Sequence, residues 1–150
     1  MVYEMHEGDV VVSCDPERLD LDRIHAFLTA SYWAEGIAPE TVARSIENSI
    51  PFGLYLSGEQ VGFARVITDL ASYAYLADVY VEEPFRGRGL SKLLMRAVLA
   101  HPELQGLRRW LLGTRDAHGL YRQFGFSELR VPERWMEKAA PGLYDPEAHE

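Results

Sequence analysis

The residues best suited to chemistry stand in one short run, Arg86-Gly87-Arg88-Gly89-Leu90-Ser91, which follows an apolar segment. Apolar residues recur at helical spacing from the fifth residue of this run onward, so a helix is predicted to begin there with its first N–H groups free. Free N–H groups and the helix dipole bind phosphate oxygens. Both glycines permit the backbone conformations that such a loop needs, and both arginines add fixed positive charge. The run therefore predicts a site for a phosphate-bearing ligand.

This run resembles the R/Q-x-x-G-x-G/A pyrophosphate loop of the GNAT superfamily of N-acetyltransferases, with Ser91 at the last Gly/Ala position. A later segment, Leu120-Tyr121-Arg122-Gln123-Phe124-Gly125-Phe126, is similar to the family's LYxxxGF segment. Pro84 and the apolar strand before it also stand where the family has them. The two motifs at the proper separation are more specific than either alone, and the resemblance extends over about residues 52–126. A nucleotide P-loop fits poorly, because no G-K-[S/T] follows the glycines.

The resemblance implies an α/β fold in which helices flank a central, mixed but mostly antiparallel sheet, splayed between its fourth and fifth strands. It implies acetyl-coenzyme A (acetyl-CoA) as co-substrate and no metal. The loop of residues 86–91 (Arg86, Gly87, Arg88, Gly89, Leu90 and Ser91) would hold the pyrophosphate. By the same resemblance the fourth strand pairs with the pantetheine arm, so that Val79 N–H polarises the acetyl carbonyl and Val81 binds the pantetheine amides. Tyr121 would protonate the departing sulfur.

The general base is left open between three sources. Asp78 is the only acid within the fourth strand, and a cleft carboxylate is a candidate base. A structural role, in which Asp78 binds backbone amides or Arg65 of the neighbouring strand, has equal weight, and a bulge usual for this fold prevents alternation from deciding its face. His118, which shares a helix face with Tyr121, and ordered water are the other sources.

Aromatic residues supply the candidate surface for the acceptor. We expect Tyr32, Trp33 and Tyr75, together with His118, to bind the acceptor substrate. Tyr73, Trp135 and Glu35 are further candidates for the same surface, although most aromatic residues of a small domain belong to its core. Such a surface favours an amine on an apolar body.

The composition narrows the class of protein. A chain of 150 residues with 47% hydrophobic residues predicts a single domain over 1–150, with an irregular tail at about 141–150. The acidic first residues, without a long apolar block, predict neither a secretory signal nor a spanning helix, and hence a cytoplasmic location. Cys14 is the only cysteine, which excludes an internal disulfide. A net charge of −8 argues against nucleic-acid and membrane binding.

The hydrophobic patterns and turn signals place the elements that must position these residues. Strands are expected at 9–13, 52–56, 61–68, 73–81 and 108–113, with a last β region at about 126–138. Helices are expected at 21–32, 39–48, 90–100 and 117–124.

Three functions follow in order of preference. The first is acetyl transfer from acetyl-CoA to a primary amine of a small molecule by direct attack. The second is acetylation of a lysine or N-terminal amine of a protein, and the third is an acyl-CoA-binding module without catalysis. The sequence leaves a homodimer open.

Overall fold

The computed structural model describes residues 2–143 of the chain. The chain divides into two compact units, Met1–Leu112 and Gly113–Glu150, which we describe separately. The single domain over 1–150 stays a prediction. The expected tail is described only at 141–143, which form a turn, and its remainder at 144–150 lies outside the described residues.

The first unit is built on a six-stranded sheet in the order β1-β2-β3-β4-β5-β6. Its strands are β1 (Glu4–Glu7), β2 (Val10–Ser13), β3 (Ile50–Leu56), β4 (Glu59–Thr68), β5 (Tyr73–Val81) and β6 (Arg109–Leu111). Neighbours are antiparallel except β5 and β6, which run parallel. The predicted mixed, mostly antiparallel sheet is confirmed. The sequence patterns missed β1, whose polar residues form an edge strand with no continuous apolar face.

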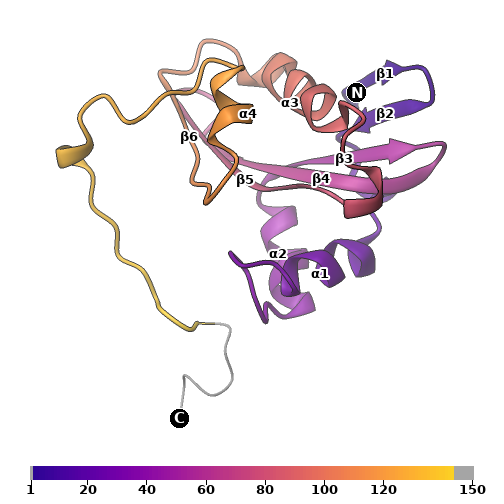
Figure 1. Cartoon of the computed structure of the whole chain (residues 1–150), viewed down its shortest axis with the longest axis horizontal. Coiled ribbons are helices and arrows are strands. Elements are labelled where there is room, and N and C mark those ends of the chain that lie inside the picture. Colours follow the sequence, from indigo (N-terminus) through magenta and orange to yellow (C-terminus); the bar gives the residue numbers. More distant parts are fainter. Residues whose placement is uncertain (1, 144–150) are drawn as a thin grey trace. The chain divides into compact units, whose positions relative to one another are not determined.

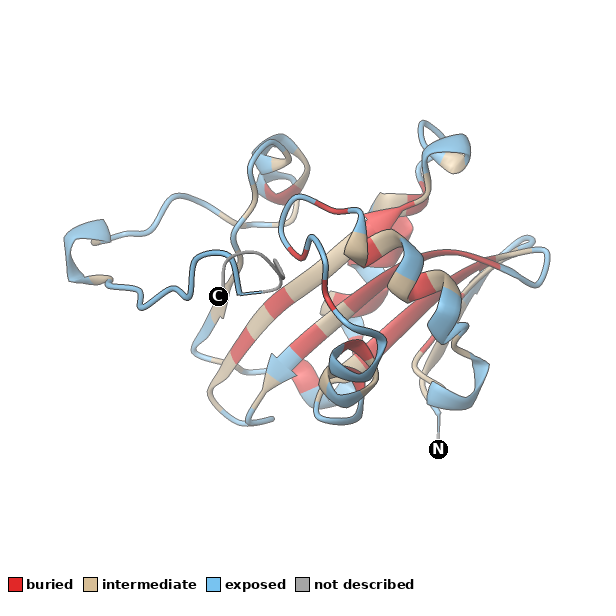
Figure 2. Ribbon diagram, turned by 90° about the horizontal axis from the view of Figure 1, so that it is seen from below, coloured by how far each residue is buried: buried red, intermediate tan, exposed pale blue. Residues whose placement is uncertain are grey.

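Helices cover both faces of this sheet (Figure 1). The helices α1 (Leu21–Thr29) and α2 (Pro39–Glu47) lie on one face, and α3 (Leu90–Ala100) lies on the other. Asp20 caps α1 by accepting the N–H of Arg23 at 3.1 Å, and Pro39 occupies a first-turn position where its missing N–H costs nothing. Figure 2 shows buried residues concentrated on the central strands, and the large side chains Phe52, Phe63 and Leu94 are fully buried. The core thus holds β3, β4 and β5 in place.

The sheet opens between β5 and β6, its fourth and fifth predicted strands. These strands pair only at Tyr73↔Arg109, Ala74↔Trp110 and Tyr75↔Leu111. The rest of β5, from Leu76 to Val81, has no strand partner on that side among the described residues. The predicted splay is therefore present, and it leaves backbone groups of β5 along an open edge.

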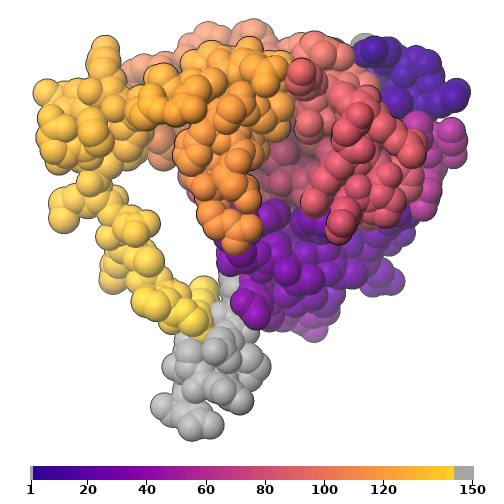
Figure 3. Space-filling view, in the orientation of Figure 1, coloured from indigo at the N-terminus to yellow at the C-terminus, as the bar shows by residue number. Residues whose placement is uncertain are grey.

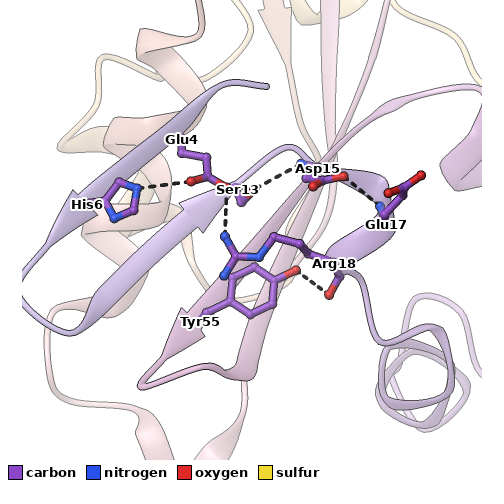
Figure 4. Close-up of polar contacts among 7 residues, drawn as sticks. All are labelled: Glu4, His6, Ser13, Asp15, Glu17, Arg18 and Tyr55. Carbon is purple, nitrogen blue, oxygen red and sulfur yellow. Dashed lines mark hydrogen bonds and ion pairs between the residues drawn. The ribbon is translucent and has the colours of Figure 1, made fainter. Parts of the chain in front are cut away.

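A polar network fixes the edge hairpin to the rest of the sheet (Figure 4). The Glu4 carboxylate accepts hydrogen bonds from Ser13 Oγ at 2.7 Å and from Arg18 Nη1 at 2.8 Å. Tyr55 on β3 donates its hydroxyl to the carbonyl of Arg18 at 3.0 Å, and the Arg18 guanidinium lies over the Tyr55 ring. The Ser13 hydrogen bond, followed by the ones from Arg18 and His6, lowers the pKa of Glu4. The network therefore has a structural role, since it connects β1 and β2 to β3.

The second unit contains one α-helix, α4 (His118–Arg122), among its described residues. The β region predicted at about 126–138 is wrong: the structure has no strand there, only a 3₁₀ turn at Pro132–Arg134. Most residues from 127 to 143 are exposed, and Figure 3 shows them, in yellow, as a thin run of side chains. A strand needs a ladder partner and a buried face, and Pro132 lacks the N–H for such a ladder.

Candidate active site

The glycine loop of residues 86–91 turns the chain from β5 into α3. Gly87 and Gly89 have φ of 78° and 77°, in the left-handed region, while an added Cβ at either would meet nothing within 4 Å. Glycine is thus needed here for its backbone conformation and not for space. No side chain caps α3, and the N–H groups of residues 87–92 have no acceptor in the part of the chain that the structure describes. The loop therefore presents consecutive free donors.

The two arginines of the loop lie beside these donors. Arg86 donates Nε to the carbonyl oxygen of Val81 at 2.8 Å, and the Arg88 guanidinium lies 5.7 Å from the Phe85 ring centroid. Both side chains are exposed. Their charges are consequently available to an anion at the start of α3.

A β-bulge interrupts β5 just before this loop. Phe63 pairs with Tyr80 and Arg65 pairs with Ala77, so Ala64 alone on β4 faces both Asp78 and Val79. This count of two residues against one defines a bulge. At the bulge the backbone of Asp78 has a φ of 55°, which is uncommon for a residue other than glycine. The expected bulge is confirmed.

After the bulge, alternation of the ladder sets the direction of the β5 backbone groups. Glu82 donates its N–H to the Val61 carbonyl at 2.8 Å, so its backbone faces β4. Backbone groups of successive strand residues point to opposite sides, so Val81 and Val79 face the open edge. The Val81 carbonyl also points away from β4, since it accepts a hydrogen bond from Arg86 Nε instead of from β4. Within the described residues, this alternation directs the N–H groups of Val79 and Val81 toward the splay.

Asp78 is held by two donors. Its Oδ2 accepts from Arg65 Nε at 2.8 Å, and its Oδ1 accepts from Trp33 Nε1 at 2.8 Å. The side chains of Arg65 and Asp78 are 15% and 11% exposed. The ion pair with Arg65 is the structural role weighed above for Asp78. Its use as a general base stays a prediction, because each carboxylate oxygen retains a further lone pair.

Trp33 and Tyr32 form an exposed aromatic wall beside Asp78. The predicted first helix ends early, at Thr29, because Ser31 donates its hydroxyl to the Leu28 carbonyl at 2.7 Å and accepts from Ala34 N–H at 3.1 Å. The two wall residues therefore follow α1 in a turn. Their rings meet edge to face at 5.1 Å, with 48% and 40% of Tyr32 and Trp33 exposed. A wall of this kind suits an apolar group that carries an amine.

Other β5 residues complete the same face of the sheet. Tyr75 is half-buried and pairs with Ile67, so it shares the face of Arg65, two residues earlier on β4. Sequence reasoning missed Tyr80 and Phe27, whose rings stack at 3.8 Å. The hydroxyl of Tyr80 is buried and has no hydrogen-bond partner in the described residues, and burial raises the pKa of Tyr80. A tyrosine within a strand pattern gives no signal for such an arrangement.

The second unit carries Tyr121 and His118. Tyr121 is 8% exposed, and its ring meets Phe126 edge to face at 6.0 Å. The Phe126 N–H donates to the Tyr121 carbonyl at 3.2 Å. This hydrogen bond joins the end of α4 to the last residue of the second motif. His118 is exposed at the first position of α4. The roles of Tyr121 and His118 stay predictions.

Cys14 is unsuited to nucleophilic chemistry. Burial, followed by the charge of Glu4, raises the pKa of the Cys14 thiol to about 12. The thiolate is the nucleophile, so this cysteine is inert near neutral pH. Among residues 2–143, no group of three or more His, Cys, Asp or Glu side chains is placed to hold a metal ion. None of the helices described is long and apolar enough to cross a membrane.

A splayed mixed sheet, a bulged strand at the splay and a glycine loop that opens a helix are the features expected from the resemblance to the GNAT acetyltransferases. The chain belongs to the Acetyltransferase (GNAT) family, whose model matches residues 19–126. It is an acyltransferase that transfers acetyl groups, and acetyltransferases of this family use acetyl-CoA as co-substrate.

Similarities to individual proteins support this family assignment. The chain is 32% identical over 147 residues to FG08082 of Gibberella zeae, whose name assigns it as an acetyltransferase, with 82% of each chain covered. It is 50% identical to xcc2953 of Xanthomonas campestris pv. campestris, a structure assigned to the same family, with a TM-score of 0.90 over 93% of this chain and 99% of that one. Glucosamine-6-phosphate N-acetyltransferase of Arabidopsis thaliana, at 17% identity, TM-score 0.57 and coverage of 93% and 97%, shows the shared fold.

Proposed function

We propose that the protein transfers acetyl from acetyl-CoA to a primary amine of a small molecule by direct attack. The observation that carries this proposal is the open edge of β5, where the N–H groups of Val79 and Val81 face the splay next to the glycine loop. A thioester with a pantetheine arm and a pyrophosphate presents hydrogen-bond acceptors in the same order. The loop binds the pyrophosphate through its free N–H groups and its arginines.

The reaction requires one new bond and one broken bond. The neutral amine nitrogen bonds to the acetyl carbon, the carbon–sulfur bond breaks, and the products are an amide and the coenzyme A thiol. Val79 N–H stabilises the developing oxyanion, and a preorganised backbone donor of this kind contributes about 3 kcal/mol. Tyr121 gives the sulfur its proton. The proton lost by the amine passes to Asp78, to His118 or to ordered water.

The acceptor amine is proposed to bind against the aromatic wall of Tyr32 and Trp33, with Tyr75 on the adjoining part of the sheet. Aromatic faces attract both apolar groups and ammonium ions. Because Arg65 already balances the Asp78 charge, we infer that ring contacts outweigh ion pairing in the recognition of the acceptor. This favours amines attached to an aromatic or aliphatic body.

The exposure of the aromatic wall also supports a second candidate. Tyr32 and Trp33 are 48% and 40% exposed, which suits a lysine side chain or an N-terminus presented by a protein. A third candidate, acyl-CoA binding without catalysis, predicts tight binding and no turnover.

Thiol release in a panel of amines tests the three candidates. The panel contains 2-phenylethylamine, tryptamine, a polyamine, an amino acid and a lysine-containing peptide, each with acetyl-CoA in excess. Amine-dependent thiol release, with the acetylated amine found by mass spectrometry, is expected for the aromatic amines first. Release with the peptide alone favours the second candidate. Binding of acetyl-CoA with no release for any amine contradicts catalysis of amine transfer.

A further inference from the structure

A network of side-chain hydrogen bonds joins four segments of the protein at the β5 bulge. Trp33 follows α1, Ser49 follows α2, Arg65 lies on β4, and Asp78 lies on β5. We propose that Arg65 is a positioning residue which, through Asp78, holds the bulge that turns the N–H of Val79 to the open edge of β5. This inference rests on the proposed function of Val79.

The backbone at the bulge needs an external restraint. Asp78 has a φ of 55°, a conformation disfavoured for residues that carry a Cβ, although aspartate tolerates it better than most. The ladder resumes on its far side at Phe63↔Tyr80 with the parity of side chains reversed. If residue 78 relaxed to an ordinary strand conformation, the side to which the Val79 N–H points would change. The direction of that donor thus depends on the conformation of Asp78.

The Arg65 guanidinium supplies this restraint. It donates Nε to Asp78 Oδ2 at 2.8 Å and Nη1 to Ser49 Oγ at 3.0 Å. Ser49 in turn donates its hydroxyl to the Ser45 carbonyl in the last turn of α2, at 2.7 Å. The guanidinium therefore ties the bulge to the helix layer, and the two partly buried charges compensate each other.

Trp33 completes the restraint from the other side. Its indole N–H donates to Asp78 Oδ1 at 2.8 Å, while its ring contacts Tyr32 and lies 6.3 Å from Phe27. Both oxygens of the carboxylate are thus fixed, one by the helix layer and one by the aromatic wall. This arrangement links the position of the wall to the direction of the proposed oxyanion donor.

A substitution that keeps the charge but removes the planar fork isolates this role. Lysine carries its three N–H donors on one nitrogen and cannot reach Asp78 and Ser49 with the geometry of a guanidinium. Arg65→Lys is therefore compared with wild-type protein and with Arg96→Lys. Arg96 on α3 pairs with Glu7 at 3.1 Å, both side chains are at least half exposed, and the residue lies outside the proposed site. It is a matched control for the loss of an arginine ion pair.

The first measurement is the slow transfer of acetyl to water, which needs no acceptor amine. The water oxygen bonds to the acetyl carbon, the carbon–sulfur bond breaks, and the coenzyme A thiol is counted. Arg65→Lys is expected to lower kcat about tenfold to a hundredfold, part of the effect of losing an oxyanion donor, while the Kd of acetyl-CoA changes less than about twofold. Arg96→Lys is expected to match wild type in both quantities.

The second measurement is spectroscopic and does not depend on turnover. A ketone analogue of acetyl-CoA, in which a methylene separates sulfur and carbonyl, binds without reacting. Isotope-edited infrared spectroscopy then reports the hydrogen bond to its carbonyl. The stretch is expected at lower frequency in wild type and in Arg96→Lys, and it is expected to move back toward the value in water in Arg65→Lys. A role in folding alone would leave the stretch unchanged.

A further variant covers the case in which Arg65→Lys does not fold. Asp78→Ala removes the carboxylate but keeps the Cβ that disfavours a positive φ, so the bulge is expected to relax, with the same loss of kcat and the same carbonyl shift. Wild-type kcat and an unshifted carbonyl in whichever variant folds would overturn the role of Arg65. Wild-type protein that neither binds acetyl-CoA nor releases thiol would instead overturn the proposed function and this inference together.

Discussion

Arg23 of α1 binds Glu82, the residue that follows β5 and begins the turn toward the glycine loop. Its Nε and Nη2 donate to the two oxygens of the Glu82 carboxylate at 2.7 and 2.5 Å, and its Nη1 donates to Glu59 at 3.0 Å. The pairing with Glu82 is bidentate, the geometry in which guanidinium–carboxylate pairs are strongest. It neutralises an acidic side chain immediately before a loop that is proposed to hold a pyrophosphate.

Arg23→Gln is expected to weaken acetyl-CoA binding by leaving the Glu82 charge uncompensated near the phosphates. Both side chains are partly exposed, so solvent screens the effect and a rise in Kd of about threefold to tenfold is expected. The double variant Arg23→Gln with Glu82→Gln should recover most of the affinity. Calorimetric titration at low ionic strength measures all three proteins. Equal Kd values for the single and double variants would exclude this electrostatic account.

Tyr121→Phe is expected to lower kcat at least about tenfold with little change in the Kd of acetyl-CoA. The hydroxyl is needed only as the sulfur leaves, so its loss affects the transition state and not the bound ground state. Steady-state kinetics with the best amine of the panel, together with calorimetry, gives both quantities. A packing role for Tyr121 would show itself as a fall in melting temperature with a normal kcat per folded molecule.

Asp78→Asn distinguishes proton transfer from positioning at the bulge. Asparagine tolerates a positive φ, so the bulge should persist. If the carboxylate accepts the amine proton, kcat/KM should fall about 100-fold to 10,000-fold, and the deficit should shrink at higher pH, where more amine is already neutral. If Asp78 only positions the bulge, the deficit should be smaller and independent of pH. Unchanged kcat/KM would assign the proton to His118 or to water.

Cys14 is expected to contribute stability that is lost at alkaline pH. Burial raises the pKa of its thiol from 9.0 to about 12 in the folded protein, so the folded state disfavours the thiolate. The contribution is complete below about pH 9 and decreases as the pH rises toward 12. The difference in unfolding free energy between wild type and Cys14→Ala, from urea titrations at several pH values, should shrink over that range. A difference that stays constant would contradict the shift.

The sequence predicted the elements whose signals are local. The bounds of β5 and α3 agree with the expected 73–81 and 90–100, because their apolar patterns and the glycines between them specify a strand, a turn and a helix. Edge strand β1 was missed, and the β region at 126–138 was wrong, because pairing depends on neighbours that are distant in sequence. Among the candidate site residues, the Asp78–Arg65 pair was one of two equal alternatives.

The parts of the site that could not be predicted are long-range contacts. Trp33 reaches Asp78 from 45 residues away, and Phe27 stacks on Tyr80 across the helix layer and the sheet. Periodicity can mark a side chain as inward or outward, but it does not identify the group that the side chain meets. The bulge adds to this limit, since one extra residue reverses every later side chain of the strand.

Binding of acetyl-CoA by the glycine loop is the central claim, and calorimetric titration of wild type and Gly89→Val tests it directly. Gly89 has a φ of 77°, which a β-branched residue strongly disfavours. A Cβ added at this position would meet no atom within 4 Å, so the substitution tests the backbone conformation and not steric space. We expect wild type to bind acetyl-CoA with one site per chain and to melt at a higher temperature in its presence. The folded Gly89→Val variant should lose both effects. Equal affinity of the two proteins, or no binding by wild type, would contradict the account.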